Sequence, residues 1–318
     1  HARSRVYRWG EDGLLGICDN QCRLCFSVAL WNGEDPILKE RPFGLANEEG
    51  NHGEDIKDYY FHIANTPTHS FMRGLYKYPQ ARFPYEQLVE ENGRRGRDQP
   101  EYELVDTGLF NEGRYFDVFI DYAKASPTDL LIRIRAINRG PEAAPLSLLP
   151  TLWLRNTWAW GYPDATRQPM RLAGERVITP ALADLASYEL LLNGSGRWLF
   201  TDNETNNERL YGQPNTTPFQ KDGFHRLLIE GEQGAINPVG EGTKAATLLQ
   251  HTLEPGETWT VELRLRAVEQ LDSAADSAPF GDAFNALFEA REQEWQAYME
   301  HRLPGLAPDD RLIHNTAL

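Results

Sequence analysis

Apolar and polar residues alternate with a period of two along several segments of the chain. In residues 115–122 every second residue is apolar, and the positions between them include Asp117 and Asp121. Residues 130–136 and 259–267 show the same pattern with arginines on the polar face. Such alternation predicts strands of a sheet that is buried on one face and charged on the other.

Shorter apolar runs separated by turn residues extend this pattern over some 250 residues. A hairpin is expected from 14–17 and 24–31, with Asp19 and Asn20 in the turn, and two strands are expected around Thr66-Pro67. Further strands are predicted at 176–178, 188–192, 198–200, 224–228 and 246–253. This spacing predicts a mainly β protein built as one large antiparallel sandwich.

The pattern becomes helical near the end of the chain. Residues 83–96 form the first predicted helix, and residues 280–301 carry an apolar stripe at helical spacing. Residues 307–318 have the pattern of another helix that the chain ends within, so we expect a further helical domain beyond it. The predicted organisation is a β-sandwich domain at 1–270, a linker with an amphipathic helix at 271–306, and the start of a truncated helical domain at 307–318.

The stretch Leu149–Gly161 holds three of the eight tryptophans. Its first half alternates, so Leu152 and Leu154 are expected in the core and Trp153 on the other face. The second half is expected to leave the strand and enter a loop. There the cluster is either a corner of the core or a docking and sugar-stacking surface, whose candidate residues are Arg155, Asn156, Trp158 and Trp160.

Net charge limits the classes of partner. The formal net charge is −15, which argues against nucleic acid and anionic membranes, because both require a basic surface. A carbohydrate is compatible with an acidic protein, although the charge does not select it. No apolar run is long enough to cross a bilayer, and no signal peptide is visible at the start of the sequence.

The three cysteines have the spacing C-x3-C-x2-C, which radical-SAM enzymes use to hold an iron–sulfur cluster. They are Cys18, Cys22 and Cys25. That cluster loop follows a strand of a parallel α/β barrel, whereas these residues fall on a predicted hairpin without alternating helices. We therefore predict free cysteines in a reducing compartment, a cytoplasmic location, and neither a metal nor a cofactor.

Two groups of polar residues that contain carboxylates are candidate sites of chemistry. Asn51, His52, Glu54 and Asp55 form a compact polar set that could serve as a metal or acid/base site, but one histidine with adjacent acids lacks a metal-ligand pattern. We favour a solvated loop there and keep these four as substrate-binding or domain-interface candidates. The pair Asp117 and Asp121 would lie about 13 Å apart on a strand, too far for a retaining glycosidase and long for an inverting one.

Many segments of the chain resemble the N-terminal part of bacterial glycoside hydrolase family 63 proteins, relatives of processing α-glucosidase I and mannosylglycerate hydrolase. The similar segments are 7–13, 35–41, 50–55, 66–70, 76–80, 106–108, 115–118, 122–125 and 149–161. The resemblance implies a super-β-sandwich, a linker helix and an (α/α)6 barrel that carries two catalytic carboxylates. Those carboxylates lie beyond residue 318 in the family, and family members have additional sequence before residue 1, so no catalytic residue is assigned to this chain.

Two functions follow as hypotheses. In the first, the chain is the non-catalytic β-sandwich part of an inverting α-glycosidase that acts on oligosaccharides or small glycosides, with its own barrel as partner. In the second, it is a stand-alone carbohydrate-binding module that holds a sugar on Trp158 and Trp160.

Overall fold

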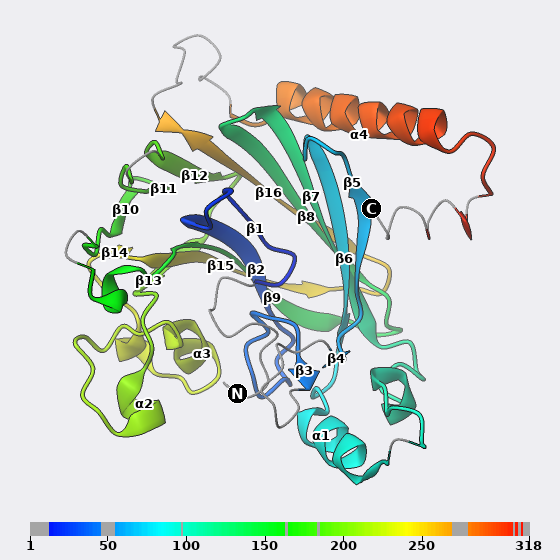
Figure 1. Cartoon of the computed structure of the whole chain (residues 1–318), viewed down its shortest axis with the longest axis horizontal. Helices are drawn as coiled ribbons and strands as arrows, with labels where there is room; N and C mark the ends of the chain where they lie inside the picture. The colour runs from blue at the N-terminus through cyan, green and yellow to red at the C-terminus, as the bar shows by residue number, and fades with distance from the viewer. Residues whose placement is uncertain are drawn as a thin grey trace.

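The computed structural model consists of two antiparallel β-sheets packed face to face, with short helices at one end and a long helix on one outer face (Figure 1). It describes residues 13–45, 55–96, 98–162, 165–182, 185–268, 279–307, 309–310 and 313. The predicted antiparallel sandwich is confirmed.

The larger sheet has nine strands in the order β14-β10-β11-β12-β16-β8-β7-β6-β5. Their bounds in that order are Glu241–Gly242, Met170–Ala173, Arg176–Ile178, Tyr188–Leu192, Thr258–Ala267, Asp129–Asn138, Tyr115–Ser126, Phe71–Pro79 and Tyr60–Asn65. The long central strands are those whose alternation was clearest in the sequence.

The smaller sheet has five strands in the order β1-β2-β9-β15-β13. They span Ile17–Cys18, Leu24–Trp31, Ala144–Leu154, Lys244–Leu253 and Arg197–Thr201. A separate pair, β3 (Gly44–Leu45) and β4 (Asp55–Ile56), lies outside both sheets. The predicted hairpin is confirmed as β1 and β2, with Ile17 opposite Phe26 and Cys18 opposite Cys25.

The main core fills the space between the sheets. Phe116, Val118 and Ile120 of β7 enter it from the larger sheet, and Leu152 and Leu154 of β9 enter it from the smaller one. All five are almost completely buried, as the period-two pattern predicted for the inward face. Burial of apolar surface on this scale is the dominant stabilising contribution to such a domain.

The expectation that the larger sheet is buried on one face only is wrong. Asp117 and Asp121 are only 5% and 2% exposed. Helix α4 (Asp282–Arg302) covers part of the face that carries them (Figure 1). Its Phe284 and Phe288 pack against apolar residues of β5 to β8. Both aspartates form ion pairs with cationic side chains there. The helix itself agrees with the stripe predicted at 280–301.

The remaining helices are short. They are α1 (Tyr85–Arg94), α2 (Asn207–Tyr211) and α3 (Gly223–Leu228), with single 3-10 turns at Leu104–Thr107, Trp158–Trp160 and Gln233–Ala235. The helix predicted at 83–96 is confirmed as α1.

The strand predicted at 224–228 is wrong, because this segment is helix α3. Phe224 and Leu227 are three residues apart, a helical spacing, and both pack on the outer face of the smaller sheet. Gly223 permits this close packing, since a Cβ at that position would lie 2.6 Å from the Ala235 carbonyl oxygen.

Within the described residues, no helix is both long and apolar enough to cross a membrane. The helix expected in 307–318 falls largely outside the described residues, and the predicted domain boundaries stay predictions.

Candidate functional site

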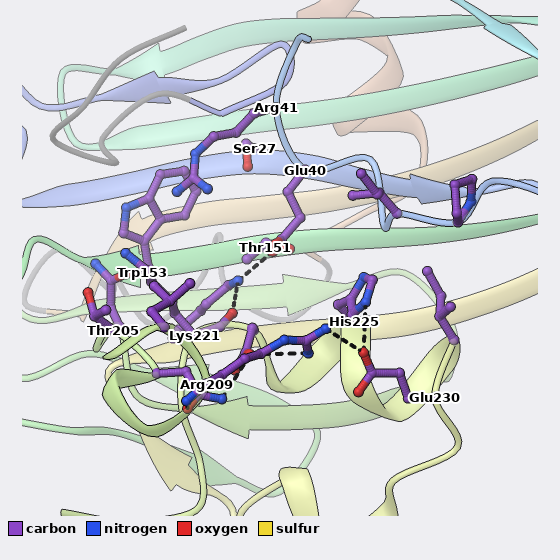
Figure 2. Close-up of a pocket in the computed structure, with 18 of the residues that line it drawn as sticks. Ser27, Glu40, Arg41, Thr151, Trp153, Thr205, Arg209, Lys221, His225 and Glu230 are labelled. Atoms are coloured by element: carbon purple, nitrogen blue, oxygen red, sulfur yellow. Dashed lines mark hydrogen bonds and ion pairs between the residues drawn. The ribbon is translucent and has the colours of Figure 1, made fainter. Parts of the chain in front are cut away.

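A pocket of about 400 Å³ lies on the outer face of the smaller sheet (Figure 2). Its floor consists of side chains from three adjacent strands: Ser27 of β2, Thr151 and Trp153 of β9, and Lys244 of β15. Cross-strand register aligns them, because Ser27 lies opposite Thr151 and Trp153 lies opposite Lys244. These polar positions alternate with the inward core residues of the same strands, so the strand period itself positions the floor.

Two segments far apart in the sequence form the walls. Residues 36–41 follow β2 on one side, and residues 203–230, which include α2 and α3, lie on the other. A hydrogen bond from Leu38 N to His225 Nδ1 (3.3 Å) joins the two walls. The volume falls within the range of about 300–1,000 Å³ that small-molecule sites usually have.

The charged side chains of the pocket are paired with each other. Lys244 Nζ donates to a Glu40 carboxylate oxygen and also to the Lys221 carbonyl oxygen (2.8 Å). On the opposite wall, Arg209 Nη2 donates to Glu230 Oε1 (2.8 Å), and His225 Nε2 lies 3.3 Å from the same oxygen (Figure 2). The pairs hold the two walls and the floor in a preformed arrangement.

These pairs keep the two glutamates of the pocket in their charged form. Burial alone would raise the pKa of Glu40, but the ammonium of Lys244 and the guanidinium of Arg41 hold that pKa below its ordinary value. Burial likewise raises the pKa of Glu230, and the hydrogen bond from Arg209 more than offsets it, so this pKa is also lowered. Neither carboxyl is suited to be a general acid, which needs a raised pKa to carry a proton at neutral pH.

Trp153 is the unusual group of the pocket. It is 6% exposed, and its Nε1 is buried without a hydrogen-bond partner among the described residues. A buried indole N–H normally donates to some acceptor, and leaving it unpaired costs about 1–3 kcal/mol. Trp153 lines the cavity, so a molecule bound there would lie against its side chain.

The predicted residues at the end of β9 form a ledge beside this pocket, which we define as residues 155–162. Asn156 Nδ2 donates to the Asn203 carbonyl oxygen (2.9 Å), and Trp158 Nε1 donates to Glu204 Oε1 (2.8 Å). Both therefore hold the loop whose Asn203 and Thr205 line the pocket.

The outer part of the ledge is aromatic and exposed. Trp160 is 52% exposed, and the Arg155 guanidinium lies 5.2 Å from its ring centre. Tyr162, 64% exposed, meets Trp160 edge to face with ring centres 6.2 Å apart. Of the four candidates, Trp160 offers an open ring face, whereas Trp158 and Asn156 act through the loop that they hold.

The structure does not describe the side chains of the other candidate set. Asn51, His52 and Glu54 lie outside the described residues, and Asp55 is described only as part of the backbone of β4. Among the described residues, no three His, Cys, Asp or Glu side chains are arranged to hold a metal ion.

The two buried aspartates of β7 act as ion-pair partners. Arg73 contacts Asp121 through two nitrogens (2.6 and 3.0 Å), and Arg135 adds a third contact (3.1 Å). Lys77 and Arg139 pair with Asp117 at 2.7 Å each. Such saturated pairing assigns both aspartates to the stability of the sheet.

Sequence reasoning missed the pocket itself. The lining residues Glu40, Lys244 and His225 come from segments about 200 residues apart, so no local motif marks them. The one available signal was a polar or aromatic residue on the non-core face of otherwise apolar strands, as at Ser27, Thr151 and Trp153.

No family model matches the chain. The chain is 38% identical, over 336 aligned residues, to the uncharacterized protein YMR196W of Saccharomyces cerevisiae. This match covers 92% of the chain and 31% of the yeast protein, so the chain spans about a third of the length of the curated relative that it matches.

Three solved structures show distant likeness. A polysaccharide lyase has a TM-score of 0.34 at 14% identity, covering 85% of this chain and 27% of that one. A protein described as a kojibiose phosphorylase from the human microbiome has a TM-score of 0.31 at 8% identity, and the match covers 96% of this chain and 35% of that one. A protein described as an aldose 1-epimerase from Escherichia coli K12 has a TM-score of 0.30 at 10% identity, and the match covers 72% of this chain and 76% of that one. All three are named for carbohydrate chemistry, but TM-scores this low carry no argument about function.

Proposed function

We propose that this chain is the non-catalytic β-sandwich part of an inverting α-glycosidase that acts on oligosaccharides or small glycosides. In this proposal the pocket over Trp153 holds part of the carbohydrate. The observation that carries it is the chemistry of the pocket, which combines a buried indole N–H that has no partner among the described residues with carboxylates held as ion-paired anions.

A sugar has the groups that this pocket would recognise. Its hydroxyls both donate and accept hydrogen bonds, so one of them can accept from Trp153 Nε1 while others meet the side chains of Ser27 and Asn203. A neutral sugar also leaves the ion pairs of Glu40 and Glu230 undisturbed, because it brings no charge to compete for Lys244 or Arg209. The cost of burying the indole N–H is then recovered on binding.

Catalysis is assigned to another domain. An inverting glycosidase needs a protonated acid and a free carboxylate base on opposite sides of the scissile bond. Because the pKa values of Glu40 and Glu230 are lowered, neither carboxyl is suited to be the protonated acid. The resemblance to family 63 implies that both groups belong to an (α/α)6 barrel, which we propose as the partner of this chain within a longer, cytoplasmic protein.

A second candidate is a carbohydrate-binding module that uses the ledge. The exposed edge-to-face pair of Trp160 and Tyr162 favours it, because sugar C–H faces stack on open aromatic rings. Trp158, part of the initial hypothesis, would act there by fixing the loop through Glu204.

The absence of catalysis is tested by incubating the pure chain with an aryl α-glucoside. We expect no release of the aryl alcohol above the buffer rate. Sustained turnover that persists through a second chromatographic step would contradict the non-catalytic assignment.

The two binding candidates are separated by calorimetric titration with an α-linked glucose disaccharide. Trp153→Phe keeps a ring but removes the N–H, and we expect it to weaken binding about tenfold, the equivalent of about 1.4 kcal/mol. Trp160→Ala should leave this affinity unchanged, as should Val239→Ala, which truncates an exposed residue outside both sites. The reverse pattern would support the ledge, and no binding at millimolar sugar would reject both.

A further inference from the structure

The three cysteines converge on the β1–β2 hairpin, although the proposed function makes no use of them. Cys18 on β1 is exposed, Cys22 in the turn is half-buried, and Cys25 on β2 is buried. Cys18 Sγ lies 3.5 Å from Cys22 Sγ, and Cys25 Sγ contacts the Cys22 carbonyl oxygen at the same distance. Three thiols therefore meet within one turn.

The turn is built to keep the thiols together. The Asp19 carboxylate accepts hydrogen bonds from the backbone N–H groups of Gln21 (3.1 Å), Arg23 (2.6 Å) and Leu24 (2.9 Å). Cys22 has a φ of +54°, in the left-handed region that a residue with a side chain seldom adopts. This conformation bends the turn back toward β1, so Cys22 is brought to Cys18 by a strained but well-anchored loop.

The geometry also suits formation of a covalent bond. Asp19 N donates to Leu24 O (3.3 Å), which makes the neighbouring pair Cys18 and Cys25 a non-hydrogen-bonded pair. Opposite Cα atoms in such a pair are about 4.5 Å apart, within the range of about 4.4–6.8 Å that a disulfide needs, but Cys25 is buried and Cys22 is the more exposed partner of Cys18. The sulfur atoms of Cys18 and Cys22 are already in contact at 3.5 Å, so little movement is needed to join them.

Charge distinguishes the three thiols. Hydrogen bonds from the thiols of Cys25 and Cys22, assisted by the nearby Arg155 guanidinium, lower the pKa of Cys18 to about 6 against the opposing effect of burial. Burial raises the pKa of Cys22, and the hydrogen bond to Cys18 together with burial raises the pKa of Cys25. At neutral pH, Cys18 is therefore mostly thiolate, the reactive form, while the other two remain thiols.

We propose that the hairpin is a redox-active thiol site in which Cys18 is the peroxide-reactive cysteine and Cys22 the resolving one. The Cys18 thiolate attacks one oxygen of hydrogen peroxide, which breaks the O–O bond and yields a sulfenic acid and hydroxide. The Cys22 sulfur then attacks the Cys18 sulfur, and the sulfenic oxygen leaves with the Cys22 proton as water. Peroxide is the two-electron oxidant, and two equivalents of an external thiol restore the reduced form by exchange and leave joined as their own disulfide.

The site lies in register with the pocket. Cys18, Cys25, Trp153 and Lys244 are successive cross-strand neighbours across β1, β2, β9 and β15. The turn is also bonded to the start of the ledge, since Arg155 N donates to the Arg23 carbonyl oxygen (3.0 Å). Formation of the disulfide would therefore change the conformation of the turn to which the residue after β9 is hydrogen-bonded.

The first test needs no variant. The reduced chain is alkylated with iodoacetamide over a range of pH, and each cysteine is quantified by peptide mass spectrometry. We expect the rate of alkylation of Cys18 to rise with pH, with a midpoint near pH 6. A midpoint near 8.5 or above, the ordinary range for cysteine, would overturn the proposal.

The second test identifies the product of peroxide. One equivalent of hydrogen peroxide should yield a disulfide between Cys18 and Cys22, with Cys25 still free. Cys22→Ser should stop at the sulfenic acid, trapped at Cys18 by dimedone, whereas Cys25→Ser, the matched control, should still form the disulfide. Three intact thiols after peroxide, or a disulfide from Cys18 to Cys25 in the unmodified chain, would overturn the assignment.

Discussion

On the outer face of the larger sheet, charged side chains pair across strands and beneath α4, whereas on the outer face of the smaller sheet they line a cavity. Asp121 shows the first arrangement, with Arg73 and Arg135 bound to it and Glu292 of α4 bound to Arg73. Lys244 shows the second, paired with Glu40 at the floor of the pocket.

The difference lies in what covers each face. A 21-residue helix with phenylalanines on its inner side packs directly on the larger sheet. On the smaller sheet α3 has six residues and covers the part around Phe224 and Leu227, and beside it the described residues leave the pocket. The same alternating strands thus give stability on one side and a site on the other.

The largest effect is expected from the cover of the larger sheet. Phe288→Ala removes a buried ring that also lies 4.4 Å from the Arg133 guanidinium, and we expect it to lower the free energy of unfolding by about 3–5 kcal/mol. Urea unfolding measures this change. Val239→Ala, at an exposed position, should change the same quantity by less than about 0.5 kcal/mol. Equal effects of the two would mean that α4 does not pack on the sheet.

The next largest effect concerns the ion pairs of the larger sheet. Asp121→Asn leaves Arg73 and Arg135 without their shared anion, and we expect it to destabilise the fold by about 2–3 kcal/mol. Glu292→Gln removes only the more exposed partner of Arg73 and should cost less than about 1 kcal/mol. Urea unfolding of both variants measures the two losses of stability. A larger loss for Glu292→Gln would mean that the contact with α4 contributes more to stability than the contacts between strands.

A smaller, pH-dependent effect is expected at the pocket. Glu40→Gln breaks the pair with Lys244 and should lower the free energy of unfolding by about 1–2 kcal/mol at pH 7. Because the pKa of Glu40 is lowered in the folded state, this contribution is present above the ordinary value of about 4.5 and is lost as the pH falls through the folded pKa.

The measurement is urea unfolding of both proteins from pH 7 down to pH 3. The difference between them should shrink steadily below about pH 4.5. A difference that stays constant over this range would show that Glu40 contributes through packing and not through its charge.

The smallest effect on stability is expected at Trp153. Trp153→Phe removes an N–H that has no partner among the described residues, so we expect a change within about 1 kcal/mol. Trp158→Phe is the matched control, because it removes an indole N–H that donates to Glu204, and it should cost about 1 kcal/mol more. Thermal unfolding compares the two, and a larger loss at Trp153 would indicate an acceptor that the structure does not reveal.

The sandwich could be predicted from the sequence because the long strands of its larger sheet have one apolar face each. Phe116, Val118 and Ile120 mark the inward face of β7 without reference to any other segment. The coverage of the opposite face could not be predicted in this way. The sequence around Asp121 is the same whether water or Arg73 surrounds its carboxylate. Whether that face is covered depends on α4, which is distant in the sequence.

The candidate site could be predicted only in part. The aromatic ledge was visible because its tryptophans are close together in the sequence, and Trp160 is indeed exposed. The pocket depends on Ser27, Trp153 and Lys244 meeting through strand register, which a single sequence does not encode locally. The segment 224–228 was misassigned for a related reason: in five residues, helical and extended apolar patterns are hard to distinguish.

The central claim is that the pocket over Trp153 binds a carbohydrate through the indole N–H. The most direct measurement follows the indole N–H resonances of the eight tryptophans by two-dimensional 15N–1H NMR during titration with an α-linked glucose disaccharide. The resonance that Trp153→Phe removes should shift in a saturable manner, as its proton gains an acceptor. If that resonance stays fixed at saturating sugar while the resonance of Trp160 moves, the claim is contradicted and the ledge is the binding surface.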